Sequence, residues 1–232
     1  MKEKTHLLKK HFTASDTVRD IIIGMSDGLT VPFAMAAGLS GAVSQTNIIV
    51  IAGCAEIAAG CISMGLGGYL AAQSDAEHYY SEQTKEYEEV KYIPQKEQEE
   101  VTDILKTYGL NQLQIEPIME YFKKNKDKWV EFMMHNELNL NEPDKARGRN
   151  SGLTIALAYL FSGFIPLTPY IFIKVSSEAL VVSALVTLAA LMIFGYGKAK
   201  LMGNNPWQSA ARTVLIGSVA AAVAYFIAKL IA

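Results

Sequence analysis

Charged residues are distributed very unevenly along this chain of 232 residues. Five long stretches carry at most one charge each, and they comprise residues 21–43, 48–72, 151–173, 179–197 and 213–231. A helix needs about 20 mostly apolar residues to cross a bilayer, and each stretch is close to that length. A soluble domain of this size has no use for five such segments. The charge distribution therefore predicts an all-α integral membrane protein with five transmembrane helices.

The overall composition conceals this division, because 50% hydrophobic residues and a net charge of -2 are ordinary for a soluble domain. Residues 75–149 hold 17 acids and 11 bases, whereas the rest of the chain holds 6 acids and 10 bases. The near-neutral total argues against nucleic acid as a partner. We expect three parts: an N-terminal arm with the first two spans (1–74), an acidic insert (75–149), and the last three spans (150–232).

Lys and Arg in the short loops predict the orientation, because such loops tend to stay in the cytoplasm. Five bases lie in the N-terminal arm before the first span. Six more close the insert or flank the loop before the last span, namely Lys145, Arg147, Arg149, Lys198, Lys200 and Arg212. We therefore expect the N-terminus and the insert to be cytoplasmic. The host membrane stays open: a vacuolar-type membrane suits a eukaryote, and the plasma membrane suits a bacterium.

No proline interrupts residues 48–93, and good helix formers continue past the apolar part of this segment. One long helix is therefore expected to cross the membrane and project into the cytoplasm, with Pro94 as its first firm stop. A second helix is expected over 95–108 and a third over 111–138, separated by Gly109. The insert is thus predicted to be a three-helix domain between the second and third spans.

Acidic and sulfur-containing side chains are spaced along these helices so that several share a face. The set comprises Glu86, Glu89, Glu97, Glu100, Met133, Met134 and Glu137. Like charges at this spacing repel unless a cation lies between them, and carboxylate with thioether ligands suits a borderline metal such as Fe²⁺. The alternative is a solvated acidic face with methionines in the helix core. His135 is a weaker candidate ligand, because an isolated surface histidine is the commoner case.

Two acids interrupt the first two spans, Asp27 and Glu56. A charge in the middle of a bilayer costs at least about 2.5–3.5 kcal/mol, so such groups are usually functional. A carboxylate that exchanges H⁺ for a cation is the chemistry of a proton-coupled transporter. Met64, eight residues after Glu56 on roughly the same helix face, would add a soft ligand to such a path. The alternative is a pair of protonated acids that hydrogen-bond neighbouring helices.

Small residues recur at four-residue spacing in the first span. Gly24 and Gly28 form a GxxxG pattern, and Gly38 and Gly41 continue it with Ala34 and Ala37. This spacing allows two helices to approach closely, so contact between the first spans of two copies of the chain is a plausible use. The pattern is common, and by itself it is weak support for a dimer.

The sequence resembles the vacuolar iron transporter family, which includes yeast and bacterial relatives. The resemblance is carried by the strings RDIIIG at 19–24, SDGLTVPF at 26–33, AAGLSG at 36–41 and ISMGLGGYL at 62–70. The order of spans and insert also fits the family, so the resemblance covers nearly the whole chain.

The resemblance implies a homodimer, formed through the first span, that exports cytosolic Fe²⁺ in exchange for H⁺ and is not an enzyme. In that family the path lies at the dimer interface, and its residues carry over to Asp27, Glu56 and Met64. The metal ligands of the insert carry over to the seven Glu and Met residues named above, and a further acid before the first span to Asp16. No prosthetic group is implied, and Zn²⁺, Mn²⁺ or Co²⁺ could occupy the same sites as Fe²⁺.

Two rival functions remain. Mn²⁺ could be the principal cargo, since oxygen ligands bind it nearly as well as Fe²⁺. Alternatively, the chain could be a membrane-anchored metal sensor or store, in which the insert binds metal and nothing crosses the membrane. The two acids within the spans argue against a store, because a store needs none.

Overall fold

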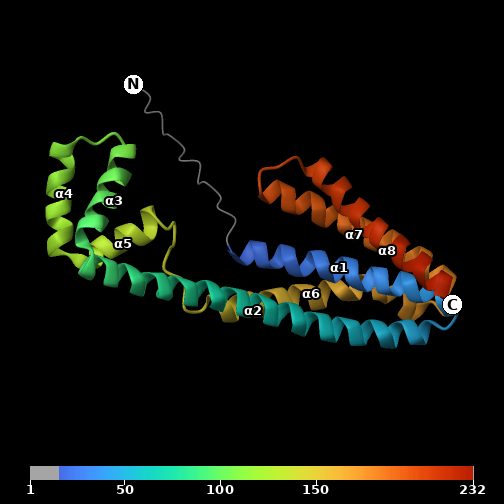
Figure 1. The fold of residues 1–232 in the computed structure, drawn as a ribbon. Helices are drawn as coiled ribbons and strands as arrows, with labels where there is room; N and C mark the ends of the chain where they lie inside the picture. The colour runs from blue at the N-terminus through green and yellow to red at the C-terminus, as the bar shows by residue number, and fades with distance from the viewer. Residues whose placement is uncertain (1–15, 232) are drawn as a thin grey trace, which may run out of the picture. The chain divides into compact units, whose positions relative to one another are not determined.

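A computed structural model of the protein describes residues 16–231, and the regular structure in that range is entirely helical. The helices are α1 (Asp16–Ala42), α2 (Thr46–Tyr92), α3 (Pro94–Thr107), α4 (Gln112–Lys124), α5 (Lys126–Asn136), α6 (Arg147–Phe172), α7 (Ser176–Leu201) and α8 (Pro206–Ile231), as labelled in Figure 1. An isolated bridge between Gln45 and Val175 joins the α1–α2 loop to the α6–α7 loop. The all-α fold class predicted from the sequence is confirmed.

Five of these helices are long and apolar enough to cross a membrane: α1, α2, α6, α7 and α8. Each overlaps one of the five stretches that carry at most one charge, which confirms the predicted number of spans. The chain is therefore a multi-pass membrane protein. The basic residues before position 16, on which the predicted orientation partly depends, lie outside the described residues.

The chain divides into two compact units, one formed by Met1–Tyr69 with Gly148–Ala232 and the other by Leu70–Arg147. Helix α2 contributes residues to both units. The insert expected at 75–149 overlaps the second unit. Each unit has its own core, so each is described separately below.

In the first unit, the glycines of α1 allow close packing against α6. A Cβ on Gly24 would meet the α6 backbone at Ile155, and a Cβ on Gly28 would meet the backbone oxygen of Tyr159 at 2.5 Å. The GxxxG pattern is therefore used within one chain. This intrachain packing accounts for Gly24 and Gly28, and contact between the first spans of two copies stays a prediction.

The small residues further along α1 face α8. A Cβ on Gly38 would lie 3.2 Å from the carbonyl oxygen of Ala224, and one on Gly41 would lie 2.9 Å from that of Tyr225. Helices α7 and α8 also approach closely, because a Cβ on Gly195 would lie 2.9 Å from the Cα of Ala210. Small residues thus fix the spacing of α1, α7 and α8.

Buried hydrogen bonds also connect the spans. The Ser40 hydroxyl of α1 shares a 2.9 Å hydrogen bond with the Tyr170 hydroxyl of α6. The Ser183 hydroxyl of α7 donates to the carbonyl oxygen of Pro166 in α6 at 2.7 Å. Polar groups in a bilayer must find partners inside the protein, so these contacts fix how the helices are rotated against one another.

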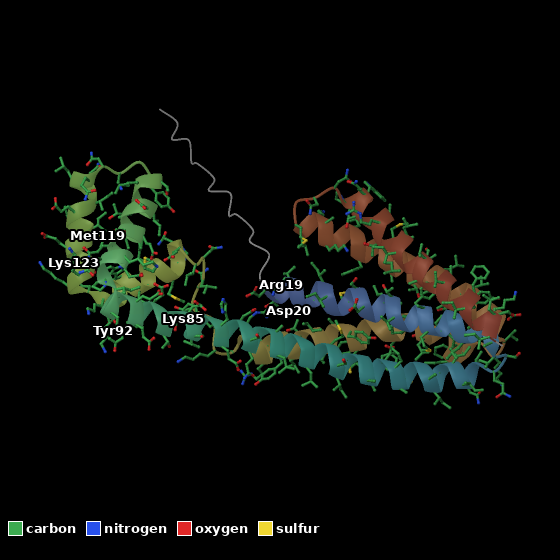
Figure 2. All side chains as sticks on the ribbon, viewed as in Figure 1. Arg19, Asp20, Lys85, Tyr92, Met119 and Lys123 are labelled. Atoms are coloured by element: carbon green, nitrogen blue, oxygen red, sulfur yellow. The ribbon has the colours of Figure 1, made fainter. Side chains whose placement is uncertain are left out.

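In the second unit, a hydrophobic core holds the last turns of α2 together with α3, α4 and α5. Val90 of α2 packs with residues of the three shorter helices, including Val101, Ile115, Trp129 and Met133. Figure 2 shows the side chains of this unit, among them Met119 of α4, which is buried, and Lys85, Tyr92 and Lys123, which lie at the surface.

The prediction of one continuous helix over 111–138 is wrong. The chain breaks at Asn125, which has φ -129° and ψ 75° and separates α4 from α5. The Asn125 side chain donates to the carbonyl oxygen of Tyr121 at 2.9 Å, a local bond that competes with helix continuation. The break allows α5 to bury Trp129 and Val130 in the core of this unit. The second unit therefore contains three short helices in addition to the end of α2.

Candidate metal site and membrane path

The turn between α2 and α3 brings glutamates from the two helices together. Helix α2 ends at Tyr92 and α3 begins at Pro94, so the chain reverses within very few residues. Glu86 and Glu89 of α2 then face Glu97 of α3, and one ligand oxygen from each lies within 4.8 Å of the others. Three carboxylate oxygens at this spacing are within reach of one divalent cation.

Burial makes this cluster electrostatically unusual. Glu97 is fully buried and Glu86 is only 4% exposed. Neither Glu97 oxygen has a hydrogen-bond partner among the described residues, and the same holds for Oε2 of Glu86. Unpartnered buried carboxylates are costly, so the arrangement favours either a proton or a cation on these oxygens.

The pKa values reflect this cost. Burial raises the pKa of Glu86 to about 7, and the charge of Glu137 adds to the effect. Burial likewise raises the pKa of Glu97 to about 7, with Glu100 and Glu89 contributing. The pKa of Glu137 is also raised, by desolvation first and then by Glu100. The charges of Glu89, Glu100 and Glu137 thus all help to raise the pKa of Glu86 and of Glu97.

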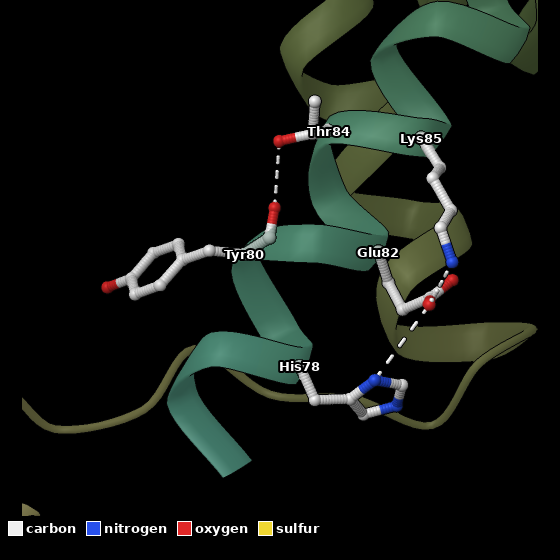
Figure 3. Close-up of polar contacts among 5 residues, drawn as sticks. All are labelled: His78, Tyr80, Glu82, Thr84 and Lys85. Carbon is white, nitrogen blue, oxygen red and sulfur yellow. Dashed lines mark hydrogen bonds and ion pairs between the residues drawn. The ribbon is translucent and has the colours of Figure 1, made fainter. Parts of the chain in front are cut away.

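Basic side chains near the cluster are paired with other acids. Lys85 lies 2.6 Å from Glu82, and His78 lies 3.8 Å from the same carboxylate, as Figure 3 shows. Lys96 pairs with Glu100 at 2.8 Å. Within the part of the chain that the structure describes, neither lysine forms an ion pair with Glu86, Glu89 or Glu97, and neither does His78. The negative charge of the cluster therefore stays available to a cation.

Met133 and Met134 lie in the hydrophobic core of the second unit and are at most 1% exposed. Their position agrees with the alternative in which they pack the core, and a role as metal ligands stays a prediction. Asp16 begins α1 in the other unit, so its predicted role as a further ligand also stays a prediction. His135 is exposed and bonds Asn141 at 3.0 Å, in keeping with a surface histidine.

In the first unit, Glu56 of α2 accepts a short hydrogen bond from the Tyr159 hydroxyl of α6. Tyr159 is 2% exposed and lies within electrostatic range of both Glu56 and Asp27. The second oxygen of Glu56 is buried and has no partner among the described groups. Asp27 precedes Gly28, and a Cβ built on Gly28 would lie 2.9 Å from the Cα of Tyr159. The two acids thus share Tyr159 as a common neighbour.

Met64 lies on α2 two turns beyond Glu56 and is half-buried. Among the described residues, no hydrogen bond or ion pair joins it to Asp27 or Glu56, so its place on a shared path stays a prediction.

Tyr159 and Gly60 were not predicted from the sequence as functional residues. A Cβ on Gly60 would lie 2.5 Å from the Tyr159 hydroxyl oxygen, so this glycine admits the ring beside Glu56. Gly60 follows Glu56 by one helical turn, and this spacing places both residues on one face. The available signal was a tyrosine in the middle of an otherwise apolar span, since its hydroxyl needs an acceptor there.

Comparisons with known proteins show relatives of nearly the whole chain. Residues 18–229 match the model of the VIT family. The chain is 50% identical to "Vacuolar iron transporter 1" of Arabidopsis thaliana, over 97% of this chain and 90% of that protein. It is 53% identical to "Vacuolar iron transporter" of Centaurea cyanus, over 94% of this chain and 89% of that protein. It is 38% identical to "Protein CCC1" of Saccharomyces cerevisiae, over 92% of this chain and 69% of that protein.

The Arabidopsis and Centaurea relatives are named as transporters and not as enzymes. The family match covers all five spans and the second unit, and the similarity extends over nearly the whole chain. The chain therefore belongs to the VIT family, the family of the vacuolar iron transporters.

Proposed function

We propose that this protein exports Fe²⁺ from the cytosol in exchange for protons. Family membership supports transport of a metal across a membrane, since its relatives are named vacuolar iron transporters. The observation that carries the proposal is the pairing of Glu56 with Tyr159 inside the spans, with the other Glu56 oxygen buried and unpartnered. A carboxylate in this state alternates between a proton and a cation at low energetic cost.

The acidic cluster of the second unit is the proposed capture site. Glu86, Glu89 and Glu97 supply oxygen ligands for Fe²⁺, the transported substrate, and Glu100 and Glu137 add negative charge around them. Because Glu86 and Glu97 have a pKa of about 7, each carries a proton about half of the time in a neutral cytosol. Metal binding releases these protons, and acid conditions release the metal.

The path through the spans is proposed to use Asp27, Glu56 and Met64. Asp27 and Glu56 exchange metal for protons that enter from the acidic side, while Met64 adds a thioether ligand that favours a borderline metal. We place the N-terminus and the second unit in the cytoplasm, because the bases at Arg147, Arg149 and Lys198 flank that side of the spans. An acidic compartment on the far side supplies the driving force.

A homodimer is part of the proposal, and it rests on the resemblance to the family. The glycines of α1 do not support it, since they pack against α6 and α8 of the same chain. An apolar groove between α1 and α6, lined by residues such as Ile21, Met25 and Phe161, is the surface of α1 that a second copy would meet.

Mn²⁺ is a second candidate cargo. The three groups that the structure brings within 4.8 Å of one another all offer carboxylate oxygen and no sulfur or nitrogen. Such ligands bind Mn²⁺ nearly as well as Fe²⁺, because neither a thiolate nor an imidazole favours the softer ion.

Metal uptake into proteoliposomes with an acidic interior tests this function. Wild type should accumulate Fe²⁺, and Asp27→Asn should lower the uptake rate by about tenfold or more because the exchangeable carboxylate is lost. Glu178→Gln is the matched control, since Glu178 is an exposed acid in the first turn of α7. Uptake that depends neither on the pH gradient nor on Asp27 would contradict the proposal, and parallel assays with Mn²⁺ rank the two cargoes.

A further inference from the structure

A cavity of about 410 Å³ lies where α7 ends and α8 begins, apart from the acids discussed above. Its polar lining comes from both helices and the loop between them, and includes Lys198, Asn204, Gln208, Ser209 and Arg212. A cavity of this size is within the range that holds small polar ligands. No acid lines it, so the charge of this basic pocket is positive.

The two cations of the basic pocket are not neutralised by the protein. Among the residues that the structure describes, no carboxylate forms an ion pair with Lys198 or Arg212. Both side chains line the same pocket. Lys198 instead lies over the ring of Phe194, 5.3 Å from its centroid. Two like charges in one pocket repel each other, and an anion from outside the chain would offset this repulsion.

Hydrogen-bond donors in the basic pocket suit an oxyanion. The backbone N–H groups that begin α8 are already capped, because those of Trp207 and Gln208 donate to the Asn205 side chain at 3.2 and 3.3 Å. The site therefore depends on its side chains. The guanidinium of Arg212, the ammonium of Lys198 and the amide of Gln208 are donors of the kind that bind phosphate oxygens.

The position of the basic pocket along the spans points to a membrane surface. Tyr196 of α7 and Trp207 of α8 contact each other edge to face, with ring centroids 5.2 Å apart. Tyr and Trp concentrate at the level of lipid headgroups. Met202 and Ile216 add apolar walls next to the cations. Basic pockets between transmembrane helices bind phosphorylated headgroups elsewhere by this combination.

We propose that the basic pocket binds a phosphate group, held by Lys198 and Arg212. The phosphate comes either from an anionic phospholipid headgroup in the adjacent leaflet or from a soluble phosphate compound. Binding needs neither the acids of the spans nor those of the second unit, so it is independent of the transport proposed above.

Binding to the purified full-length chain in nanodiscs of neutral lipid tests this proposal. The probes are a short-chain phosphatidylinositol phosphate, measured by native mass spectrometry, and inorganic pyrophosphate, measured by calorimetry. Lys198→Gln with Arg212→Gln should weaken binding of at least one probe by about 20-fold, since each cation near a lipid phosphate contributes about fivefold. Lys200→Gln with Lys229→Gln removes the same net charge outside the pocket and should change affinity by less than about twofold.

The outcomes distinguish the sources. If the Lys198/Arg212 double variant loses affinity for the lipid alone, the bound phosphate belongs to a lipid headgroup. If it loses affinity for pyrophosphate, the ligand is a soluble phosphate compound. Binding of neither probe, or equal losses in the two double variants, overturns the proposal. The thermal midpoint of each variant in detergent shows whether it is folded, and the exposed position of Arg212 makes unfolding by its substitution unexpected.

Discussion

At the scale of single residues, the raised pKa of two buried glutamates should control metal binding. Glu86 and Glu97 have a pKa of about 7 because burial and neighbouring carboxylates disfavour their charged forms. Both must lose a proton to act as ligands. Affinity for Mn²⁺ should therefore rise by about 100-fold between pH 6 and pH 8, and calorimetry at several pH values in buffers of different ionisation enthalpy would count the released protons.

The same two residues should be essential for binding in the second unit. Glu86→Gln with Glu97→Gln removes two anionic ligands without a large change in volume, and should weaken Mn²⁺ binding by about 100-fold. Glu88→Gln with Glu99→Gln is the matched control, because both of these acids are exposed and lie on the same helices. Equal affinity in the two double variants would show that these glutamates are not metal ligands and form a solvated acidic face.

Tyr159 is the residue that ties Glu56 to α6, so its hydroxyl should matter for transport. A hydrogen bond to a charged group contributes about 1.5–3 kcal/mol. Tyr159→Phe should therefore slow Fe²⁺ uptake into proteoliposomes by about tenfold or more. Tyr170→Phe removes a hydroxyl from the same helix that bonds Ser40 instead of an acid, and its uptake should match that of wild type. Equal rates for the two variants would show that the Tyr159 hydroxyl has no part in the path.

At the scale of helices, Gly60 sets the contact between α2 and α6. A Cβ at this position would lie 2.6 Å from the Cζ atom of Tyr159, so the ring must move away from Glu56. Gly60→Ala should lower stability by about 1–3 kcal/mol and reduce transport. Gly67→Ala on the same helix meets nothing within 4 Å and should be neutral or slightly stabilising. Thermal midpoints in detergent measure both effects, and similar midpoints for the two variants would contradict this packing.

The second unit should become less stable as pH rises when metal is absent. Glu86 and Glu97 have a pKa of about 7 in the folded unit, against an ordinary value of 4.5, so the folded state holds protons that the unfolded state releases. The contribution of these two groups to the free energy of unfolding is fully present below pH 4.5 and is lost as pH rises through about 7. The loss is at most roughly 3 kcal/mol for each group.

Trp129 reports this loss, because it is buried in the core of the second unit, and a Trp207→Phe background makes it the only tryptophan. Its fluorescence should reveal a lower unfolding temperature at pH 8 than at pH 5.5, and saturating Mn²⁺ should remove most of the difference. A midpoint that rises with pH in the absence of metal would contradict the burial of these carboxylates.

The sequence predicts the long elements well and the short breaks poorly. The five spans and the end of α2 before Pro94 follow from apolar length and from proline, both of which act locally. The break at Asn125 does not follow from either, because the run of lysines around it is compatible with a helix. Burial of Trp129 and Val130 by α5 decides the break, and such tertiary packing is not visible in a periodic pattern.

At the scale of the whole molecule, the candidate site also depends on tertiary packing that the sequence pattern does not reveal. Helical spacing placed Glu86 with Glu89 and Glu97 with Glu100, but only the turn at Pro94 brings Glu97 to Glu86 and Glu89. The glycines of α1 meet α6 and α8 of the same chain, and the sequence does not reveal these partners, because spacing shows that a helix can approach closely but not which helix does so. Tyr159 was missed for a related reason, since its partner Glu56 lies about a hundred residues away in sequence.

Coupled movement of metal and protons tests the central claim most directly. Proteoliposomes at equal pH on both sides, with the voltage clamped by potassium and valinomycin, receive external Fe²⁺ while dyes inside report metal and pH. Exchange predicts that the interior becomes alkaline as Fe²⁺ enters, and that Asp27→Asn abolishes both signals together. Fe²⁺ entry without any change in internal pH would contradict proton-coupled exchange.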